Sequence, residues 1–449
     1  MANSYLTRTN SSTGSTTLAT ISMWVKMSNI STDQALWEMY ADNSNYFRIR
    51  YASDSTIRLQ ADISNSTILD KRTTRKFKDV NGFYHIVVQI NLADSTAEDK
   101  LKLYINGERE TLFSTNTNTS ATSGNWVGGG NSFNTTIGRH PSDAAYLQGY
   151  ISHYCFVDGT VVAPTVFGET ESTSGIWKFK SPTGVTFGTN GFHLKFENSG
   201  SLGNDSAGSN NLTVNGNLRQ SIDTPTIVYP TWNTGYRSGA SFTNGNLTYT
   251  SPSNNPVFGS LTSMGVTKGK WYAECKYTAG SNHYLILGVA DDNFATLYDL
   301  GSANASDLGK NGTTGSIAYV VNTGAYRINN NNTSWGSAGG DGDILMMAMD
   351  HDNNKLYFGV NGVWGASSNP ATGSNGIDVS SVLTGDTWFF GVTNDTSGTE
   401  TVADFNFGAG LFGATAITSA GLNGNGSLFE YDVPSGYYAL NTKNLNTYG

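Results

Sequence analysis

The residues of this chain that could carry acid–base chemistry are carboxylates that alternate along short stretches. Hydrolysis of a glycosidic bond requires two carboxyl groups that face each other at about 5–10 Å, and alternate positions on one strand meet that requirement. The pairs with this spacing are Glu108/Glu110, Asp341/Asp343 and Asp350/Asp352. The first pair follows a hairpin turn beside Arg109, and the others lie among glycine and turn-forming residues. We therefore expect structural carboxylates, no catalytic residues and no enzyme.

Metal-ligating and nucleophilic residues form no motif of known spacing. The histidines are scattered, at positions 85, 140, 153, 193, 283 and 351. Asp350-x-Asp352-x-Asn354 imitates the start of a calcium loop, but Lys355 and Asn361 stand where an EF-hand needs Gly and Glu. There is no zinc motif, no phosphate-binding loop, and no Gly-x-Ser-x-Gly elbow between a strand and a helix. We expect no metal site and no cofactor, with a looser calcium site at a rim of the first domain left open.

Composition indicates an all-β fold with more than one domain. The 449 residues exceed one ordinary core, and only 14% of them are charged. The 52 glycines and the abundant Asn, Ser and Thr favour turns, whereas Tyr, Phe, Val and Thr favour strands. Cys155 and Cys275 lie in separate apolar runs, so we expect two buried free thiols.

Charge and hydropathy argue against two classes of partner. Residues 1–220 hold 18 basic and 18 acidic side chains, so residues 221–449, with 8 and 17, carry the whole net charge of −9. An acidic half does not suit nucleic acid. No apolar run approaches the roughly 18 residues of a membrane span, and residues 1–4 do not begin a signal peptide. We expect no nucleic-acid binding and no membrane insertion. The basic cluster consists of Lys71, Arg72, Arg75, Lys76 and Lys78. We interpret it as a solvated loop, with an anion-binding patch as the alternative.

Local patterns place strands and hairpins. Residues 18–27 alternate with period two, which predicts a strand with Ile21, Met23 and Val25 toward a core and Trp24 on the opposite face. The dipeptides Asn106-Gly107 and Asn361-Gly362 each follow a Lys-Leu-Tyr strand and predict tight hairpins.

Five short motifs in the first part of the chain, in this order, resemble a known family. They are Thr20–Val25, Gly82–Val88, Lys102–Gly107, Ile137–Arg139 and Leu147–Ile151. Together they resemble a laminin-G or concanavalin-A-like lectin domain. The resemblance implies a jelly-roll sandwich of two antiparallel sheets, in a family whose members often bind glycans or proteins, some through calcium in rim loops.

The second half resembles a SPRY domain over about residues 240–410. The matching pieces are Gly269–Tyr272, Ile286–Ala290, Lys355–Phe358, Asn361-Gly362 and Asn406–Gly408. This resemblance implies an antiparallel β-sandwich whose loops recognise proteins. We therefore predict an all-β chain with a lectin-like domain at 1–160, a connector at 161–235 packed partly on it, a SPRY-like domain at 236–432 and a tail at 433–449.

The connector and the tail carry a further resemblance. The stretches Gly191–Phe196, Leu202–Gly208, Asp223–Thr226 and Pro434–Thr442 resemble a module of tailed-phage virion proteins. The resemblance implies a tail-fibre or head-decoration protein of a virion that is made in the bacterial cytoplasm. The partners that it implies are other virion proteins, a host-surface glycan or protein, and further copies of the chain. The alternatives are a structural protein that clamps capsid or tail neighbours, and a polysaccharide depolymerase.

Binding residues are sought in loops, because loops on rigid sandwiches carry recognition. The aromatic residues flanked by Gly and Asn are Trp126, Trp335 and Trp364. We predict that they contribute to ligand binding, and the alternative for each is a plug over a sheet edge.

Overall fold

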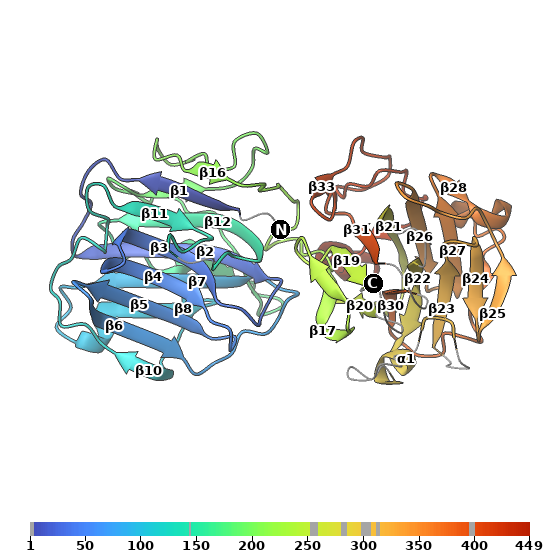
Figure 1. Ribbon diagram of the computed structural model, residues 1–449, viewed down its shortest axis with the longest axis horizontal. Coiled ribbons are helices and arrows are strands. Elements are labelled where there is room, and N and C mark those ends of the chain that lie inside the picture. The colour runs from blue at the N-terminus through green and yellow to red at the C-terminus, as the bar shows by residue number, and fades with distance from the viewer. Residues whose placement is uncertain are drawn as a thin grey trace. The chain divides into compact units, whose positions relative to one another are not determined.

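The computed structural model describes residues 4–142, 145–251, 259–279, 285–297, 307–310, 315–394 and 400–449. The chain divides into two compact units, Met1–Gln220 with Thr224–Thr226 and Ser221–Asp223 with Ile227–Gly449. Each unit is built from stacked, almost wholly antiparallel sheets, which confirms the predicted all-β class with two sandwiches (Figure 1). Among the described helices, none has the length and apolar character needed to cross a membrane.

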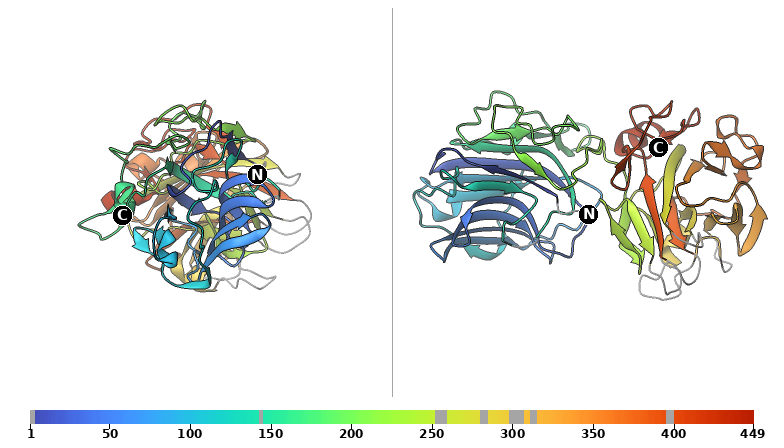
Figure 2. Two further views of the ribbon diagram at one scale, coloured as in Figure 1. Left: turned by 90° about the vertical axis from the view of Figure 1, so that its left-hand side faces the viewer. Right: turned by 45° about the horizontal axis from the view of Figure 1, so that its top comes forward.

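The first unit is a sandwich of an eight-stranded and a six-stranded sheet (Figures 1 and 2). The eight-stranded sheet runs in the order β10 (Phe113–Thr117), β6 (Ser66–Thr73), β5 (Ile57–Ile63), β4 (Asn45–Tyr51), β3 (Gln34–Asp42), β11 (Asn134–Ile137), β1 (Tyr5–Thr9) and β16 (Thr213–Asn215). The six-stranded sheet runs β15 (Phe192–Leu194), β12 (Gly149–Asp158), β2 (Leu18–Met27), β7 (Tyr84–Asn91), β8 (Leu101–Ile105) and β9 (Glu108–Arg109).

Alternating apolar residues fill the space between these two sheets. Ile21, Met23 and Val25 of β2 are buried there, as the period-two pattern predicts. The ring of Trp37 on β3 is fully buried and lies 4.9 Å from the ring of Phe156 on β12. Large aromatic side chains therefore join the two sheets.

The second unit is also a two-sheet sandwich. Its seven-stranded sheet runs β17 (Trp232–Ser238), β20 (Gly259–Thr262), β30 (Trp388–Asn394), β22 (Leu285–Asp291), β23 (Ser316–Val320), β24 (Ala325–Ile328) and β25 (Asn331–Ser334). The nine-stranded sheet contains β18 (Ser241–Thr243), β19 (Thr248–Ser251), β31 (Thr401–Asn406), β21 (Lys270–Ala279), β26 (Ile344–Asp350), β27 (Lys355–Val360), β28 (Val363–Trp364), β29 (Ile377–Asp378) and β34 (Tyr438–Ala439). The helices are α1 (Asp292–Leu297) and α2 (Thr442–Tyr448).

Both predicted hairpins are confirmed. Asn361 and Gly362 have φ angles of 49° and 84° and join β27 to β28. Asn106 and Gly107, at 50° and 82°, join β8 to β9. Positive φ at both central positions is the geometry for which Asn-Gly is favoured. Cys155 and Cys275 are both free and buried, as expected.

The segments assigned to a connector and a tail take part in the units. Residues 161–220 belong to the first unit, where β15 pairs with β12 and β16 pairs with β1. Residues 433–449 belong to the second unit and contribute β34 and α2.

A buried carboxylate holds part of the C-terminal region against β21. Both oxygens of Glu274 accept backbone N–H bonds, from Glu430 and Tyr431, at 2.8 Å, and the Tyr272 hydroxyl donates a third bond at 2.9 Å. Burial raises the pKa of Glu274 to about 7 in spite of these donors. Glu274 thus fixes the backbone at Glu430 and Tyr431 to β21.

Residues 160–190, called the cover below, lie on the face of the six-stranded sheet that points away from the core. They include the hairpin of β13 (Gly168–Thr170) and β14 (Trp177–Phe179). Gln89 of β7 donates to the carbonyl of Val162 at 2.8 Å, and Trp24 of β2 meets the ring of Phe179 edge-on. The cover explains why Trp24, on the non-core face of its strand, is only 2% exposed.

Three histidines of the six-stranded sheet each meet an aromatic ring of the cover. His85 stacks near Trp177, which donates its indole N–H to His85 Nδ1 at 3.0 Å. The other two stacked pairs are His153 with Phe179 and His193 with Phe187. Because an indole only donates, Nδ1 of His85 is an acceptor and Nε2 carries the proton toward the Ser22 hydroxyl, 2.9 Å away. This Ser–His contact therefore cannot activate the serine as a nucleophile.

We predict that mild acid loosens the cover. Burial lowers the pKa of His85 to about 3. Burial is also the largest cause that lowers the pKa values of His153 and His193 to about 4, with smaller contributions from His193 and Lys195 at His153 and from Lys195 at His193. These values lie below the ordinary 6.5, so the unfolded chain takes up protons first, and stability that is complete above about pH 6.5 declines as the pH falls toward 4. Between about pH 6.5 and 4, His85 alone lowers the free energy of unfolding by about 1 kcal/mol for each unit by which the pH falls.

Amide hydrogen exchange of peptides from residues 160–190, corrected for the intrinsic pH dependence, measures this effect. We expect clear loss of protection at pH 5 relative to pH 7.5, and a smaller loss in a variant with His153→Gln and His193→Gln. His351→Gln in the second unit is the control and should leave the loss unchanged. Equal protection at both pH values would show that the histidines do not limit the cover.

Candidate functional site

Two of the three tryptophans predicted to bind a ligand lie in the cores. Trp126 is 1% exposed and packs against Phe47 between the sheets of the first unit. Trp335 is 8% exposed and donates its indole N–H to the carbonyl of Phe358 at 2.9 Å. Trp364 on β28 is half-buried. Of the three, only Trp364 leaves part of its ring accessible to a ligand.

The alternating carboxylates are engaged in turns and ion pairs. Asp350 pairs with Lys270 at 2.9 Å and accepts the backbone N–H of Asn353, while Asp352 accepts the N–H of Gly269. The bond from Asn353 lies within the turn that follows β26, whereas the contacts with Lys270 and Gly269 connect this turn to the start of β21. Further contacts include Asn361 to Asp343 at 2.7 Å, the Gly340 N–H to Asp343 at 2.7 Å, and Arg75 to Glu110 at 3.0 Å.

The four sheets differ in what their outer faces carry, where the outer face is the one directed away from the sandwich core. Apolar clusters lie on three of them, in the described part of the chain: under the cover on the six-stranded sheet, under the C-terminal region on the nine-stranded sheet, and under Phe294 and Leu308 on the seven-stranded sheet. The outer face of the eight-stranded sheet is instead densely polar. This face is the candidate functional site.

The polar face arises from alternation along four adjacent strands, which is interrupted by register shifts in β3 and between β5 and β6. Phe47 and Ile49 of β4, and Leu59 and Ala61 of β5, point into the core, so the residues between them point outward. The outward residues are Glu38, Tyr40, Tyr46, Arg48, Arg50, Arg58, Gln60, Asp62, Asp70 and Arg72, called the polar network below. Strand register places them side by side, with Arg48 opposite Gln60 and Gln60 opposite Asp70.

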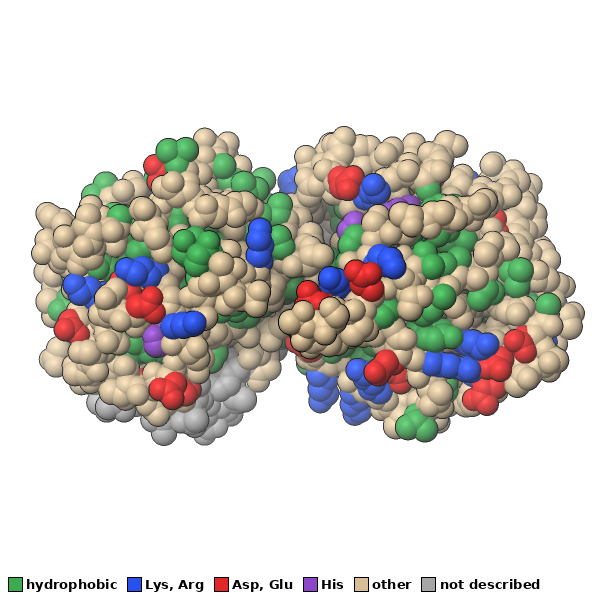
Figure 3. Space-filling model, turned by 180° about the vertical axis from the view of Figure 1, so that it is seen from behind, with side chains coloured by type: hydrophobic (Ala, Val, Ile, Leu, Met, Phe, Trp, Pro, Cys, Tyr) green, Lys and Arg blue, Asp and Glu red, His purple; other side chains and the backbone are tan. Residues whose placement is uncertain are grey.

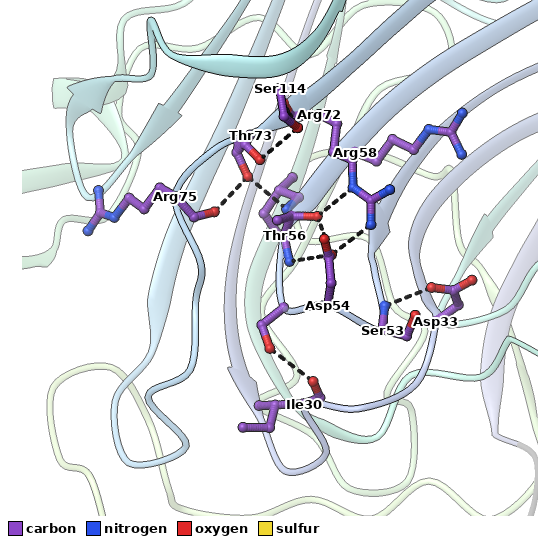
Figure 4. Close-up of polar contacts among 12 residues, drawn as sticks. Ile30, Asp33, Ser53, Asp54, Thr56, Arg58, Arg72, Thr73, Arg75 and Ser114 are labelled. Atoms are coloured by element: carbon purple, nitrogen blue, oxygen red, sulfur yellow. Dashed lines mark hydrogen bonds and ion pairs between the residues drawn. The ribbon is translucent and has the colours of Figure 1, made fainter.

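Two arginine–aspartate pairs order one end of the network. Arg58 binds both oxygens of Asp70, through Nε at 2.8 Å and Nη2 at 2.7 Å. Arg72 binds Asp54 through Nη2 at 2.8 Å and Thr56 through Nε at 3.0 Å (Figure 4). Burial would raise the pKa of Asp54, but the bonds from Thr56 and Arg72 lower it to about 2. The bidentate pairing of Arg58 with Asp70 fixes the planes of both groups, and the two bonds of Arg72 to Asp54 and Thr56 fix the plane of its guanidinium.

Arg48 lies at the centre of the network. Its Nε and Nη2 donate to Gln60 Oε1 at 3.2 and 2.6 Å, and Nη1 lies 3.3 Å from Nε2 of His140. The guanidinium lies over the Tyr46 ring, 4.8 Å from its centroid. The Tyr46 hydroxyl donates to Asp62 at 2.6 Å, and burial together with this bond raises the pKa of Tyr46 to about 12. Each side chain is thus held by a neighbour.

The network offers fixed donors and acceptors to a polar ligand. The side chains of Arg58 and Arg72 are each 33% exposed and that of Asp70 is 15% exposed. On the face of the molecule drawn in Figure 3, acidic and basic side chains lie close to one another among uncharged groups. Preorganised hydrogen-bonding groups on a rigid sheet bind at a small cost in side-chain entropy.

The sequence contains a signal for this site that loop-based reasoning misses. The stretches 45–51 and 57–63, NYFRIRY and IRLQADI, alternate apolar and hydrogen-bonding residues. Such alternation indicates a strand with one face on the core and one face exposed to solvent. It does not show that two such strands are neighbours, because pairing depends on the whole fold.

Among the described residues, no group of three or more His, Cys, Asp or Glu side chains is placed so that it could hold a metal ion. The Asp62 carboxyl also departs from the needs of acid catalysis. Burial would raise its pKa, but bonds from Tyr46, Thr67 and Gln60 outweigh burial and lower it. A general acid in glycoside hydrolysis needs a raised pKa.

Several solved structures are similar to parts of the chain. The SPRY domain of human HERC1 is 15% identical, with a TM-score of 0.30, and the match covers 39% of this chain and 96% of that domain. A heptameric SAP-like pentraxin from Limulus polyphemus is 12% identical, with a TM-score of 0.29, over 47% of this chain and 88% of its own. A putative carbohydrate binding protein from Bacteroides ovatus is 13% identical, with a TM-score of 0.35, and the match covers 50% of this chain and 59% of that protein.

No curated protein matches the chain. Residues 1–167 match the family described as the concanavalin A-like lectin/glucanases superfamily. This match spans the motifs at residues 20–151 and confirms the predicted lectin-like character of the first domain.

Proposed function

We propose that the protein binds carbohydrate through the polar network of the eight-stranded sheet. The observation that carries the proposal is the contrast among the outer faces: apolar clusters lie on three, whereas this one displays ordered guanidinium, carboxylate, amide and phenol groups. Sugar hydroxyls both donate and accept, so they suit a surface on which donors and acceptors alternate. The match of residues 1–167 to the lectin/glucanase superfamily supports the same ligand class.

The proposed activity is binding without hydrolysis and without a metal ion. Both oxygens of Asp70 are bound by Arg58. Burial would raise the pKa of Asp62, but its hydrogen bonds outweigh burial and lower that pKa. Neither carboxyl is therefore suited to protonate a leaving group. A depolymerase is the competing reading. It predicts new reducing ends when the protein is incubated with a polysaccharide that it binds, whereas our proposal predicts none.

Binding to an array of oligosaccharides, followed by titration of those retained, tests the proposal. We expect Arg48→Ala to lower affinity at least about tenfold, because it removes a charge-assisted donor and releases Gln60. Lys178→Ala, on the exposed hairpin of the cover, is the matched control and should bind normally. Chelator should leave binding unchanged. Unchanged binding by a folded Arg48→Ala protein would refute the assignment of this face.

We further propose that the protein acts on a phage particle, as a tail-fibre or head-decoration protein that attaches to a host-surface glycan. The support is the resemblance of Gly191–Phe196, Leu202–Gly208, Asp223–Thr226 and Pro434–Thr442 to a module of phage virion proteins. A purely structural clamp is the alternative. A reconstruction of particles that contain the chain distinguishes them: we expect the outer face of β3 to β6 to be exposed to solvent, whereas burial against virion neighbours would favour the clamp.

A further inference from the structure

We infer that the glycan is acidic and that its anionic substituent, a carboxylate, sulfate or phosphate ester, is bound at one end of the polar network. This inference rests on the proposed carbohydrate function. It starts from a row of three arginines on neighbouring strands: Arg50 on β4 lies opposite Arg58 on β5, which lies opposite Arg72 on β6. Directly opposed side chains have Cβ atoms about 5 Å apart, and like charges so placed repel.

Internal carboxylates order this row without using all of its donors. Arg58 donates through Nε and Nη2 to Asp70. Arg72 donates through Nε to Thr56 and through Nη2 to Asp54. In the described part of the chain neither Nη1 has a partner, and both side chains are 33% exposed. Two ordered guanidinium groups on adjacent strands therefore present open N–H donors, an arrangement that recognises oxyanions.

The other end of the network has the opposite character. There the register brings Tyr40 opposite Tyr46 and Tyr46 opposite Asp62, a row without a cation. The face thus changes from three guanidinium groups to two phenols and a carboxylate within a few residues. Such a gradient orients a ligand that carries charge at one end and neutral hydroxyls at the other.

The loop that follows β6 carries the remaining residues of the basic sequence cluster. Its backbone is tied to the turn between β4 and β5, because the N–H of Phe77 donates to the carbonyl of Ser55 at 2.7 Å. Lys76 and Lys78 flank Phe77 and are exposed. Arg75 pairs with Glu110, and Lys71 is buried with its ammonium on Asn116. The basic sequence cluster is therefore divided: Lys71 and Arg75 are held by Asn116 and Glu110, Arg72 belongs to the arginine row, and Lys76 and Lys78 are exposed on the loop after β6.

Matched pairs of ligands test the inference on the full chain. We use oligogalacturonate against its carboxyl-reduced form, and dextran sulfate against dextran, with a single-stranded oligodeoxynucleotide as a polyanion without the sugar polymer. We expect at least one acidic glycan to bind about tenfold more tightly than its neutral partner, which corresponds to one charge-assisted hydrogen bond. The preference should shrink as salt rises.

Charge-balanced variants locate the subsite. The double variant Arg58→Gln/Asp70→Asn removes a guanidinium without leaving an unpaired carboxylate, and Arg72→Gln/Asp54→Asn does the same on the next strand. Each should abolish most of the acidic preference while residual binding of the neutral partner is retained. Lys180→Gln on the cover is the control and should keep the preference. Thermal unfolding of every variant confirms that it is folded.

The outcomes separate the two proposals. Equal binding of acidic and neutral glycans, with loss in Arg48→Ala, would overturn the acidic subsite and keep the carbohydrate function. Absence of binding to any glycan would overturn both. Equally tight binding of the oligonucleotide would show a general polyanion patch and would contradict a glycan-specific subsite.

Discussion

Every strand in a two-sheet sandwich has two faces, and the core can bury only one of them. The period-two alternation of side chains makes this constraint local: each residue next to a core residue points outward. The protein meets the constraint in two ways. Tyr272, Met346 and Tyr357 on the nine-stranded sheet are covered by the C-terminal region, and Cys155 and Val157 on the six-stranded sheet are covered by residues 160–190. The outer face of β3 to β6 carries polar groups instead.

The polar network is hard to explain as a device for stability. Ion pairs that are about one-third exposed, such as Arg72 with Asp54, contribute roughly 0–1 kcal/mol each. Three arginines in register on adjacent strands repel one another, and Asp70 beside Arg58 and Asp54 beside Arg72 are needed to offset that repulsion. Shorter polar side chains at these positions would keep the face wet at a smaller cost. A binding function gives the long, planar, mutually ordered groups a reason to be there.

Sequence reasoning recovers what is local and misses what depends on tertiary pairing. The core face of residues 18–27 follows from alternation, and the hairpin at Asn361-Gly362 follows from its two positive φ angles. The burial of Trp126 and Trp335 could not be decided from the sequence, because glycine and asparagine flank loops that fold inward as well as loops that bind a ligand. The contact between Arg48 and Gln60 required the register of β4 and β5, which no single-strand pattern contains.

A crystal structure of the protein with its tightest-binding oligosaccharide tests the central claim, that the outer face of the eight-stranded sheet is the binding surface, most directly. The account predicts sugar oxygens within hydrogen-bonding distance of the guanidinium groups of Arg48 and Arg58, with the sugar lying across β4 and β5. A sugar bound at the rim loops, on the cover, or on the second unit, with Arg48 and Arg58 untouched, would contradict it.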